Sequence, residues 1–269
     1  MGTNYIAPIW RMPRNANKDK LSNYSIGFDN TNANYIQTNA SWITDLGLNG
    51  ANRLSVSIWL KPSSSAPTTA MSATSSSYGN WGENFNIRYD AGNTSLYFVG
   101  GSYASTKFSN NSVTLTTDQW HHVVFVFTST GTAAARARCW INNSEVANQS
   151  TNLWITFADL GKSLFIGRRF YGNGTSLNQW VGEISQFCIF DYSLTDGTNG
   201  TPNQIEYLYN LNNPMAITGA APVAYLPLGD NSNPNATAGY PNISVGADSV
   251  FNFVPNDKID ATIPALNNA

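Results

Sequence analysis

Residues 54–62 read Leu-Ser-Val-Ser-Ile-Trp-Leu-Lys-Pro, and the order of apolar and polar side chains in this stretch decides the fold class. Aliphatic residues occupy every second position from Leu54 to Leu60, with serine or tryptophan between them. A period of two is typical of a β-strand that buries one face, because successive side chains of a strand point to opposite sides of the sheet. Pro62 ends the run, since proline cannot donate to a strand ladder.

The same kind of signal recurs at short intervals along the chain. Residues 120–127 are apolar at almost every position, which predicts a central strand buried on both faces. Residues 63–77 are rich in Ser, Thr, Ala and Pro and are predicted to form a loop. Further strands are predicted over residues 24–28, 35–37, 85–89, 95–99, 106–108, 113–115, 135–141, 144–146, 163–167, 181–190 and 223–228.

Two local signals predict a turn and a helix. Asn142 and Asn143 separate two predicted strands, and because asparagine tolerates a positive φ they favour a two-residue hairpin turn. Residues 204–210 follow Pro202 and predict one short helix. Many short strands with a single helix indicate an all-β protein.

The composition agrees with an all-β chain and excludes other classes of protein. Charged residues make up 11% of the 269 residues, whereas an ordinary soluble domain carries about 25%. Asparagine accounts for 35 residues and aromatic residues for 13% of the chain. This mixture suits strands joined by Asn-rich turns, and it argues against both a disordered chain and a helical bundle.

Charge and hydropathy also limit the partners. The net charge is −2 and the basic residues are scattered, so no nucleic-acid partner is predicted. No apolar run approaches the ~20 residues that a membrane helix needs, so no membrane insertion is expected. The first ten residues lack a basic start followed by an apolar block, and we therefore expect synthesis in the cytoplasm without a signal peptide.

Changes in pattern divide the chain into three regions. Residues 1–22 are polar and without period, and are predicted to form an N-terminal arm. Residues 23–212 contain most of the strand signals and are predicted to form the main domain. Residues 213–269 are a C-terminal extension with one predicted strand, which we expect to pack on the main domain or on a neighbour because the segment is too small to form its own core.

Four segments in order along the chain carry a family resemblance. They are Tyr24–Ile36, Leu54–Pro62, Trp120–Phe127 with Cys139–Asn143, and Leu164–Gly167 followed by Trp180–Leu194 and Ile205–Tyr209. Together they resemble the laminin-G-like (LamG) jelly-roll domains of the concanavalin A-like lectin/glucanase superfamily. The resemblance implies a two-sheet antiparallel jelly-roll sandwich, here with N- and C-terminal arms and one short helix.

The aromatic residues and cysteines give further expectations for this sandwich. Trp59, Trp120 and Trp140 are expected between the two sheets, where large rings can bridge a gap of ~10 Å. Cys139 and Cys188 have no CxxC spacing and are predicted to be two buried, reduced thiols. A single disulfide is the alternative if their strands are adjacent.

No cofactor is predicted. The resemblance implies acidic residues after the first turn, but this chain has Asn32, Ala33 and Asn34 there. Hard cations such as calcium prefer several oxygen ligands with carboxylates among them. Calcium thus stays an alternative that the resemblance implies and these residues do not support.

The chain is predicted not to be an enzyme. Glucanases of this superfold use paired carboxylates in an E-x-D-x-x-E spacing, which is absent here. His121 and His122 would point to opposite faces of a strand, so they are not expected to act on one substrate or ion. We expect His122 to pack beside Trp120 and Val124, and His121 to make a hydrogen bond on the other face.

Aromatic residues next to amides and glycines mark the candidate binding loops. A sugar ring can stack on an aromatic side chain while amides bind its hydroxyl groups. The alternative is that these rings pack their own loops or a neighbouring subunit. The candidate glycan-binding residues are Tyr78, Asn80, Trp81, Asn84, Tyr103, Tyr171, Asn173 and Trp180.

These observations lead to three hypotheses of function. The first is a structural protein of a virion or another surface-exposed assembly, such as a phage capsid decoration or fibre protein, whose lectin-like domain contacts a glycan or a host receptor. In this role the expected partners include other subunits of the assembly, and a homo-oligomer is expected. The second is a free carbohydrate-binding lectin, and the third is a purely architectural subunit.

Overall fold

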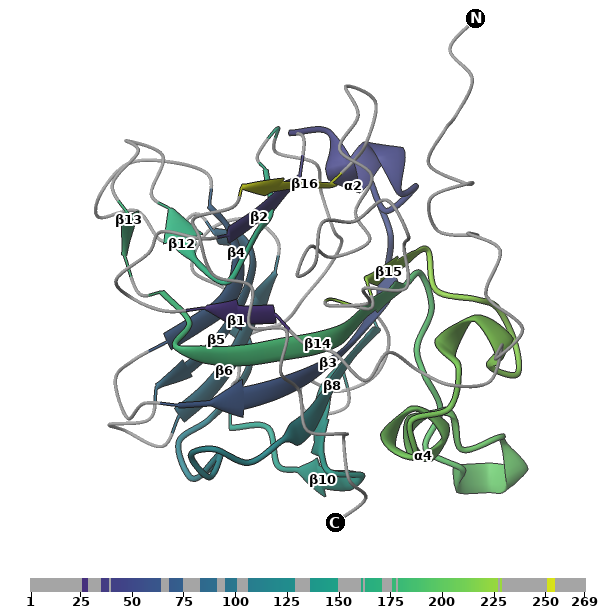
Figure 1. The fold of residues 1–269 in the computed structure, drawn as a ribbon. Coiled ribbons are helices and arrows are strands. Elements are labelled where there is room, and N and C mark those ends of the chain that lie inside the picture. The colour runs from purple at the N-terminus through teal and green to yellow at the C-terminus, as the bar shows by residue number, and fades with distance from the viewer. Residues whose placement is uncertain are drawn as a thin grey trace, which may run out of the picture.

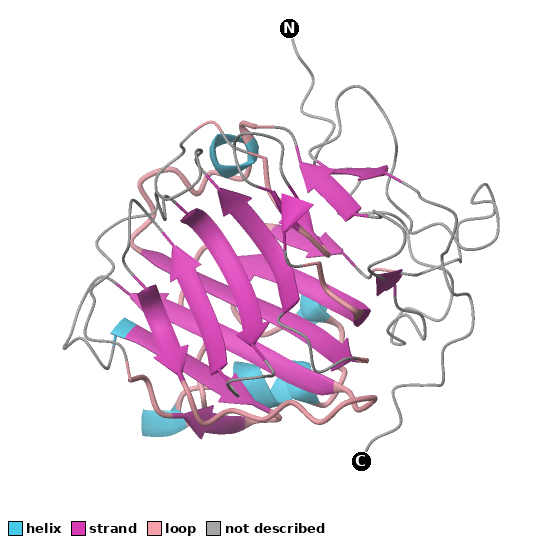
Figure 2. Ribbon diagram, turned by 90° about the vertical axis from the view of Figure 1, so that its left-hand side faces the viewer, coloured by secondary structure: helices cyan, strands magenta, loops and turns pink. Residues whose placement is uncertain are grey.

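A computed structural model of the chain describes residues 26–28, 35–38, 40–63, 68–74, 83–90, 95–100, 106–128, 136–149, 161, 163–170, 176–177, 179–226, 228 and 251–254. These residues form two antiparallel sheets that pack face to face around one core (Figure 1). Strands predominate and helices are few and short, as Figure 2 shows. The expected all-β, two-sheet antiparallel sandwich is confirmed.

The first sheet has seven strands. Six of them follow the order β1-β14-β3-β8-β9-β10, and β15 pairs with β14 outside this path. Their bounds are β1 (Ile26–Phe28), β14 (Gly182–Phe190), β3 (Arg53–Pro62), β8 (His121–Thr128), β9 (Ala137–Ile141), β10 (Ser144–Val146) and β15 (Ala224–Leu226). The apolar strand β8 lies between β3 and β9, in the central position that its sequence predicts.

The second sheet also has seven strands, in the order β16-β2-β11-β4-β5-β6-β7. Their bounds are β16 (Phe251–Val254), β2 (Tyr35–Thr38), β11 (Phe165–Ile166), β4 (Thr68–Thr74), β5 (Glu83–Asp90), β6 (Ser95–Gly100) and β7 (Thr106–Asn110). A separate pair, β12 (Arg169–Phe170) with β13 (Ser176–Leu177), lies against β4.

The alternation of inward and outward side chains along the strands explains which residues form the core. On β3 the aliphatic residues at 54, 56, 58 and 60 face the second sheet and are fully buried. On β5 the residues at 85, 87 and 89 face the first sheet in the same way. The two inner faces thus supply one shared apolar layer, as a two-sheet sandwich requires.

The expectation that Trp59, Trp120 and Trp140 lie between the sheets is wrong. Trp59 lies on the same face of β3 as the serines of this strand, and this face points away from the core. Trp140 belongs to a second cluster on the outer side of the first sheet. The tryptophans inside the main core are Trp42 and Trp180. Alternation decides this outcome, because a ring at an odd position of β3 has to leave the inter-sheet space.

The second cluster forms where a helical segment covers the outer face of the first sheet. Helix α4 (Gln204–Tyr209), the expected short helix, begins after Asn203, whose side chain accepts a hydrogen bond from the Glu206 N–H. It packs Ile205 and Leu208 onto outward residues of β8, β9 and β14. In Figure 1, α4 lies beside β3 and β8. Two 3₁₀ turns, η2 (Thr198–Gly200) and η3 (Pro214–Ala216), flank it.

Several elements differ from the sequence prediction. The predicted loop 63–77 contains β4, because cross-strand pairing with β5 overrides its Ser/Thr-rich composition. Residues 113–115 are not a strand, although their two apolar side chains are buried. A one-turn helix, α2 (Trp42–Asp45), and the strand β16 beyond residue 250 had no periodic signal that could reveal them. The predicted arm, residues 1–22, lies outside the described residues.

Candidate functional site

Four residues at one level of the second sheet form a row on its outer face, which we call the outer row: Thr69 on β4, Arg88 on β5, Tyr97 on β6 and Ser109 on β7. The strand register pairs Thr69 with Arg88, Arg88 with Tyr97, and Tyr97 with Ser109. Directly paired residues project on the same side of a sheet. This side is the outer one, because the two chain neighbours of Arg88 lie in the core.

Two atoms of the outer row are buried without a hydrogen-bond partner. They are the Thr69 Oγ1 and the Arg88 Nε. Thr69 is 0% exposed although it faces away from the core. A buried polar atom that lacks a partner costs about 1–3 kcal/mol. Protein encloses both atoms, so the groups of the outer row that a ligand can reach are the half-buried Tyr97 and Ser109 and the exposed part of the Arg88 side chain.

Arg88 has two further contacts on this face. Its Nη2 donates to the Oδ2 of Asp90 at 3.3 Å, and the side chain of Arg88 is 22% exposed. Its guanidinium lies 5.9 Å from the centre of the Tyr97 ring. A half-buried ring and a partly exposed guanidinium are thus side by side. This set of groups can stack on one face of a ligand and hydrogen-bond to its edge.

Most of the sequence-predicted binding residues lie outside the described residues. This holds for Tyr78, Asn80, Trp81, Tyr103, Tyr171 and Asn173. The backbone of Asn84 belongs to β5, and its side chain is outside the description. Their roles therefore stay predictions.

Trp180 is the exception, and the structure corrects its assignment. Its side chain is 0% exposed and belongs to the main core. The indole Nε1 donates to the backbone carbonyl of Glu183 at 3.3 Å. A ring that is enclosed on all sides cannot stack on a sugar, so Trp180 is a core residue and not a ligand contact.

The strand ends show which of the predicted loops leave the second sheet together. Thr74 ends β4 opposite Glu83, and Gly100 ends β6 opposite Phe85. The two strand ends therefore lie at the same end of the sheet. Gln179 instead bridges to Thr69 at the other end of β4. Five residues of strand span about 17 Å. The predicted set therefore belongs to two separate places, and the outer row lies at the Thr69 end.

Sequence reasoning missed the outer row, although one signal for it was present. Residues 85–89 read Phe-Asn-Ile-Arg-Tyr, so alternation alone places Arg88 on the polar face of β5. The partners of Arg88 were hidden, because a register shift between Thr69 and Met71 decides which residue of β4 lies opposite it.

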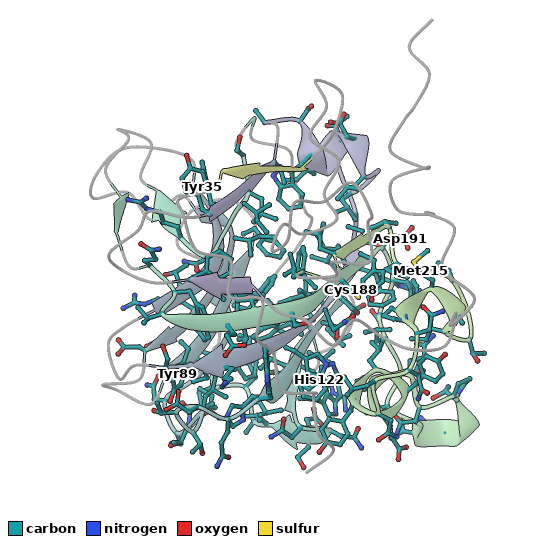
Figure 3. The ribbon with its side chains drawn as sticks, viewed as in Figure 1. Tyr35, Tyr89, His122, Cys188, Asp191 and Met215 are labelled. Atoms are coloured by element: carbon teal, nitrogen blue, oxygen red, sulfur yellow. The ribbon has the colours of Figure 1, made fainter. Side chains whose placement is uncertain are left out.

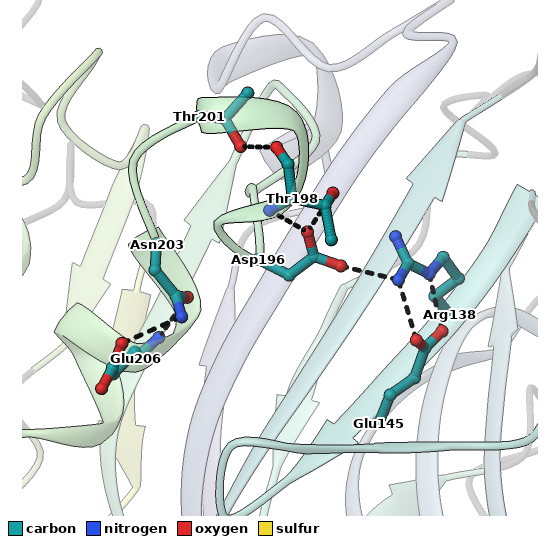
Figure 4. A network of polar contacts seen from close by, with 7 residues as sticks. All are labelled: Arg138, Glu145, Asp196, Thr198, Thr201, Asn203 and Glu206. Atoms are coloured by element: carbon teal, nitrogen blue, oxygen red, sulfur yellow. Dashed lines mark hydrogen bonds and ion pairs between the residues drawn. The ribbon is translucent and has the colours of Figure 1, made fainter.

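Three of the described carboxylates form ion pairs with basic side chains. Glu145 and Asp196 both contact Arg138: Glu145 accepts from Nε at 2.6 Å and from Nη2 at 2.8 Å, and Asp196 accepts from Nη2 at 2.7 Å (Figure 4). Glu183 forms an ion pair with Lys61 at 2.8 Å. In these contacts each carboxylate faces a cation, whereas an acid catalyst requires a raised pKa.

Asp196 shows the opposite of such a shift. Partial burial raises the pKa of Asp196, but hydrogen bonds from Thr198 and Arg138 outweigh this effect, and the pKa lies below its usual value. The guanidinium of Arg138 also lies 4.5 Å from the centre of the Trp140 ring. These contacts hold the segment before α4 against β9, and their role is structural.

The outer face of the first sheet carries a stack of aromatic rings. Trp59 lies 5.0 Å from His122 and 6.1 Å from Tyr209, measured between ring centres. The Nε2 of His122 and the Oγ of Ser57 are 2.8 Å apart. Figure 3 shows His122 in the region next to α4. Trp59 and His122 are 8% and 1% exposed, so α4 covers this stack and a ligand does not reach it.

His121 and the two cysteines follow their predicted environments, whereas the ring partners of His122 are Trp59 and Tyr209 and not the expected Trp120. His121 bonds through Nε2 to the carbonyl of Thr116, on the face opposite to His122. Cys139 on β9 and Cys188 on β14 are both buried and free, and two strands, β3 and β8, separate them. Burial raises the pKa of both thiols. The alternative of a disulfide is therefore excluded for this structure.

No three His, Cys, Asp or Glu side chains in the described ranges gather in a way that could hold a metal ion. No helix in the described part of the chain is both long and apolar enough to cross a membrane.

Comparisons with solved structures show what this fold is similar to. A native heptameric SAP-like pentraxin from Limulus polyphemus superposes with a TM-score of 0.50 at 17% identity, over 80% of this chain and 96% of that chain. A putative carbohydrate binding protein from Bacteroides ovatus gives a TM-score of 0.48 at 14% identity, over 81% of this chain and 54% of that one. At such identities the likeness concerns the fold alone.

Comparison with protein sequences identifies the family. No curated protein sequence matches the chain. The family model described as "Concanavalin A-like lectin/glucanases superfamily" matches residues 29–198, which is more than half of the 269 residues. The chain therefore belongs to the concanavalin A-like lectin/glucanase superfamily, and its two-sheet sandwich is the laminin-G-like jelly roll of that superfamily.

Proposed function

We propose that this protein is a non-enzymatic, lectin-like protein that binds a glycan at the outer row of its second sheet. The observation that carries the proposal is the half-buried ring of Tyr97 beside the partly exposed guanidinium of Arg88 on the outer face of the second sheet. Membership in a superfamily that includes lectins agrees with this role.

The chemistry of the outer row fits a sugar. A pyranose has a flat face of C–H groups that stacks on an aromatic ring, and its hydroxyl groups both donate and accept hydrogen bonds. Tyr97 offers the ring, and the partly exposed guanidinium of Arg88 offers donors at its side. The candidate loop residues Tyr78, Trp81 and Tyr171 are proposed as glycan contacts separate from the outer row.

The ion pairs of the carboxylates support a binding role without catalysis. Retaining glycosidases need two carboxyl groups about 5–5.5 Å apart with one of them protonated. Among the described acids, Glu145 and Asp196 both pair with Arg138, and Glu183 pairs with Lys61. We therefore propose that a bound glycan is released unchanged.

We further propose that the glycan or receptor contact operates on a virion or another surface-exposed assembly, in which copies of the chain form a homo-oligomer. The support is the composition: 11% charged residues and 35 asparagines suit a surface that is polar without strong charge. Native mass spectrometry tests this placement. A closed oligomer supports it, and a monodisperse monomer contradicts it.

A glycan array tests the binding function. The wild-type protein, Tyr97→Ala and a triple variant with Tyr78, Trp81 and Tyr171 changed to alanine are applied with and without calcium. Stacking on one ring is worth about 1–3 kcal/mol, so Tyr97→Ala is expected to lower affinity by tenfold or more. Arg53→Ala serves as the control, because Arg53 is exposed at the start of β3 in the other sheet.

The array separates the alternatives. Loss of binding in Tyr97→Ala with an unchanged triple variant places the site at the outer row alone. The reverse pattern places it in the loops. If no glycan binds the wild type and native mass spectrometry shows a closed oligomer, the chain is a purely architectural subunit and the proposal is wrong.

A further inference from the structure

The outer row is closed at its β4 end. Thr69 faces away from the core and is nevertheless 0% exposed. Gln179 forms a bridge to Thr69, and the strand pair β12–β13 lies against β4. Because protein covers Thr69 completely, a ligand that lies on the row cannot continue across β4 at this level.

The row is open toward the opposite edge of the second sheet. The side chain of Arg88 on β5 is 22% exposed. Tyr97 on β6 and Ser109 on β7 are half-buried, and Gln149, which lies beyond β7, is exposed. Exposure is therefore nil at β4, partial on the next three strands and greatest past β7. A chain-like ligand on the row can leave the protein on this side.

Residues 147–149 continue the sheet beyond β7. The Gln149 N–H donates to the carbonyl of Ser109 at 2.8 Å, and the Asn148 Oδ1 accepts from the Ser109 N–H at 3.3 Å. These bonds place the segment one strand spacing beyond β7, and thus about 10 Å from β6, which carries Tyr97. The accessible part of the row and this segment together are longer than a single sugar ring.

The open end offers polar groups to a second sugar unit. The Gln149 Oε1 accepts from the Asn111 N–H at 2.9 Å, which holds the Gln149 side chain beside the end of β7. With the oxygen engaged, the amide nitrogen is the group of Gln149 that can donate to a ligand. The hydroxyl of the half-buried Ser109 can both donate and accept. Such groups suit the hydroxyls of a sugar that follows the one on Tyr97.

We infer that the outer row binds the non-reducing end of a glycan chain, with the terminal sugar on Tyr97 and the following units across Ser109 and Gln149. The direction follows from the closed end, since a surface glycan is attached to its carrier through its reducing end, and only the open edge leaves room for the carrier. This inference rests on the glycan-binding function proposed above and adds which part of the chain is bound.

The first experiment tests the two ends of the ligand. The best glycan from the array is prepared in three forms: unchanged, extended by one unit at the non-reducing end, and extended by one unit at the reducing end. Isothermal titration calorimetry measures their affinities. The first extension is expected to lower affinity at least tenfold, because it meets the covered Thr69 end. The second is expected not to lower it.

The second experiment uses Gln149→Ala with the best trisaccharide and with its terminal monosaccharide, followed by NMR titration. The affinity for the trisaccharide is expected to fall about fivefold, because one hydrogen bond is lost. The affinity for the monosaccharide is expected to change less than twofold. A merely structural role of Gln149 would move both affinities together. Asn210→Ala, exposed at the end of α4 beside the other sheet, is the control and is expected to change neither.

The outcomes separate this inference from the proposed function. Tolerance of the non-reducing-end extension, or an unchanged trisaccharide affinity in Gln149→Ala, overturns the inference while leaving a glycan-binding protein. An array on which no glycan binds overturns both, and so does binding that Tyr97→Ala leaves unchanged, because the site then lies elsewhere. Loss of binding in Tyr97→Ala together with loss on non-reducing-end extension supports both.

Discussion

Arg138 on β9 and Asp196 before α4 are joined by an ion pair of 2.7 Å between Nη2 and Oδ2, although 58 residues separate them in the chain (Figure 4). The same guanidinium holds Glu145 through two bonds and lies over Trp140. One side chain thus connects the first sheet to the segment that carries α4, and this segment closes the second apolar cluster.

Arg138→Gln is expected to lower the free energy of unfolding by about 1–2 kcal/mol, because charge-assisted bonds to two carboxylates are lost at a partly exposed site. Urea denaturation measures the change. Arg53→Gln, which is exposed on β3, is the control and is expected to change the value by less than about 0.5 kcal/mol. Equal effects of the two variants would contradict a structural role for the network.

His122 is expected to make the fold sensitive to acid. Burial lowers the pKa of His122 from 6.5 to about 3, and its Nδ1 has no hydrogen-bond partner. Between these values the unfolded chain binds a proton that the folded chain does not. Stability is therefore full above pH 6.5 and falls by about 1.4 kcal/mol per pH unit below it, down to the folded pKa.

His122→Gln tests this dependence. The amide can keep a bond to Ser57, but it does not titrate, so the loss of about 2 kcal/mol between pH 6.5 and pH 5 should largely disappear. Urea midpoints at the two pH values measure it. His121→Gln is the matched comparison. Burial also lowers the pKa of His121, but the carbonyl of Thr116 opposes this shift, so that variant should keep most of the dependence.

Gly182 is expected to tolerate no side chain. It has a φ of 139°, and a Cβ built there would lie 2.0 Å from the backbone carbonyl oxygen of Lys61. Gly182→Ala should therefore cost about 3 kcal/mol or more, since backbone must move. Gly47→Ala is the control: its φ is 72° with nothing within 4 Å, so it isolates the cost of the left-handed conformation, about 1 kcal/mol. A similar loss in both variants would show that the close contact is unimportant.

Cys139 and Cys188 are expected to be unreactive in the folded protein. Burial raises the pKa of both thiols, and the thiolate is the reactive form. Ellman's reagent should detect no thiol in the native protein and two per chain in 6 M guanidinium chloride. Two thiols that react at once without denaturant would show that this region of the first sheet is open.

The prediction of the fold succeeded for the strongest local signals. The alternation over residues 54–60 and the apolar run 120–127 predicted β3 and β8 correctly. Asn142 and Asn143 form the expected turn, with φ values of 50° and 63°. Turn chemistry and a period of two depend only on neighbouring residues, and so both can be read from the sequence.

The prediction failed where pairing with distant residues decides the structure. Gln186 takes a φ of 50° at a register shift between Ser185 and Cys188. This bulge reverses the alternation of β14, so that Phe187 faces the main core and Cys188 faces the outer cluster. A strict count of alternate residues along β14 gives the opposite faces.

In the candidate site, too, local features could be predicted from the sequence and the pairing of distant residues could not. The sequence by itself determined that the chain is all-β and that Arg88 lies on the polar side of its strand, because both follow from residue types and short spacings. Only the tertiary structure decided that Thr69, Arg88 and Tyr97 lie in one row and that Trp180 is enclosed. Hydrogen bonds between strands set these neighbours, and the residues that form those bonds are far apart in the chain.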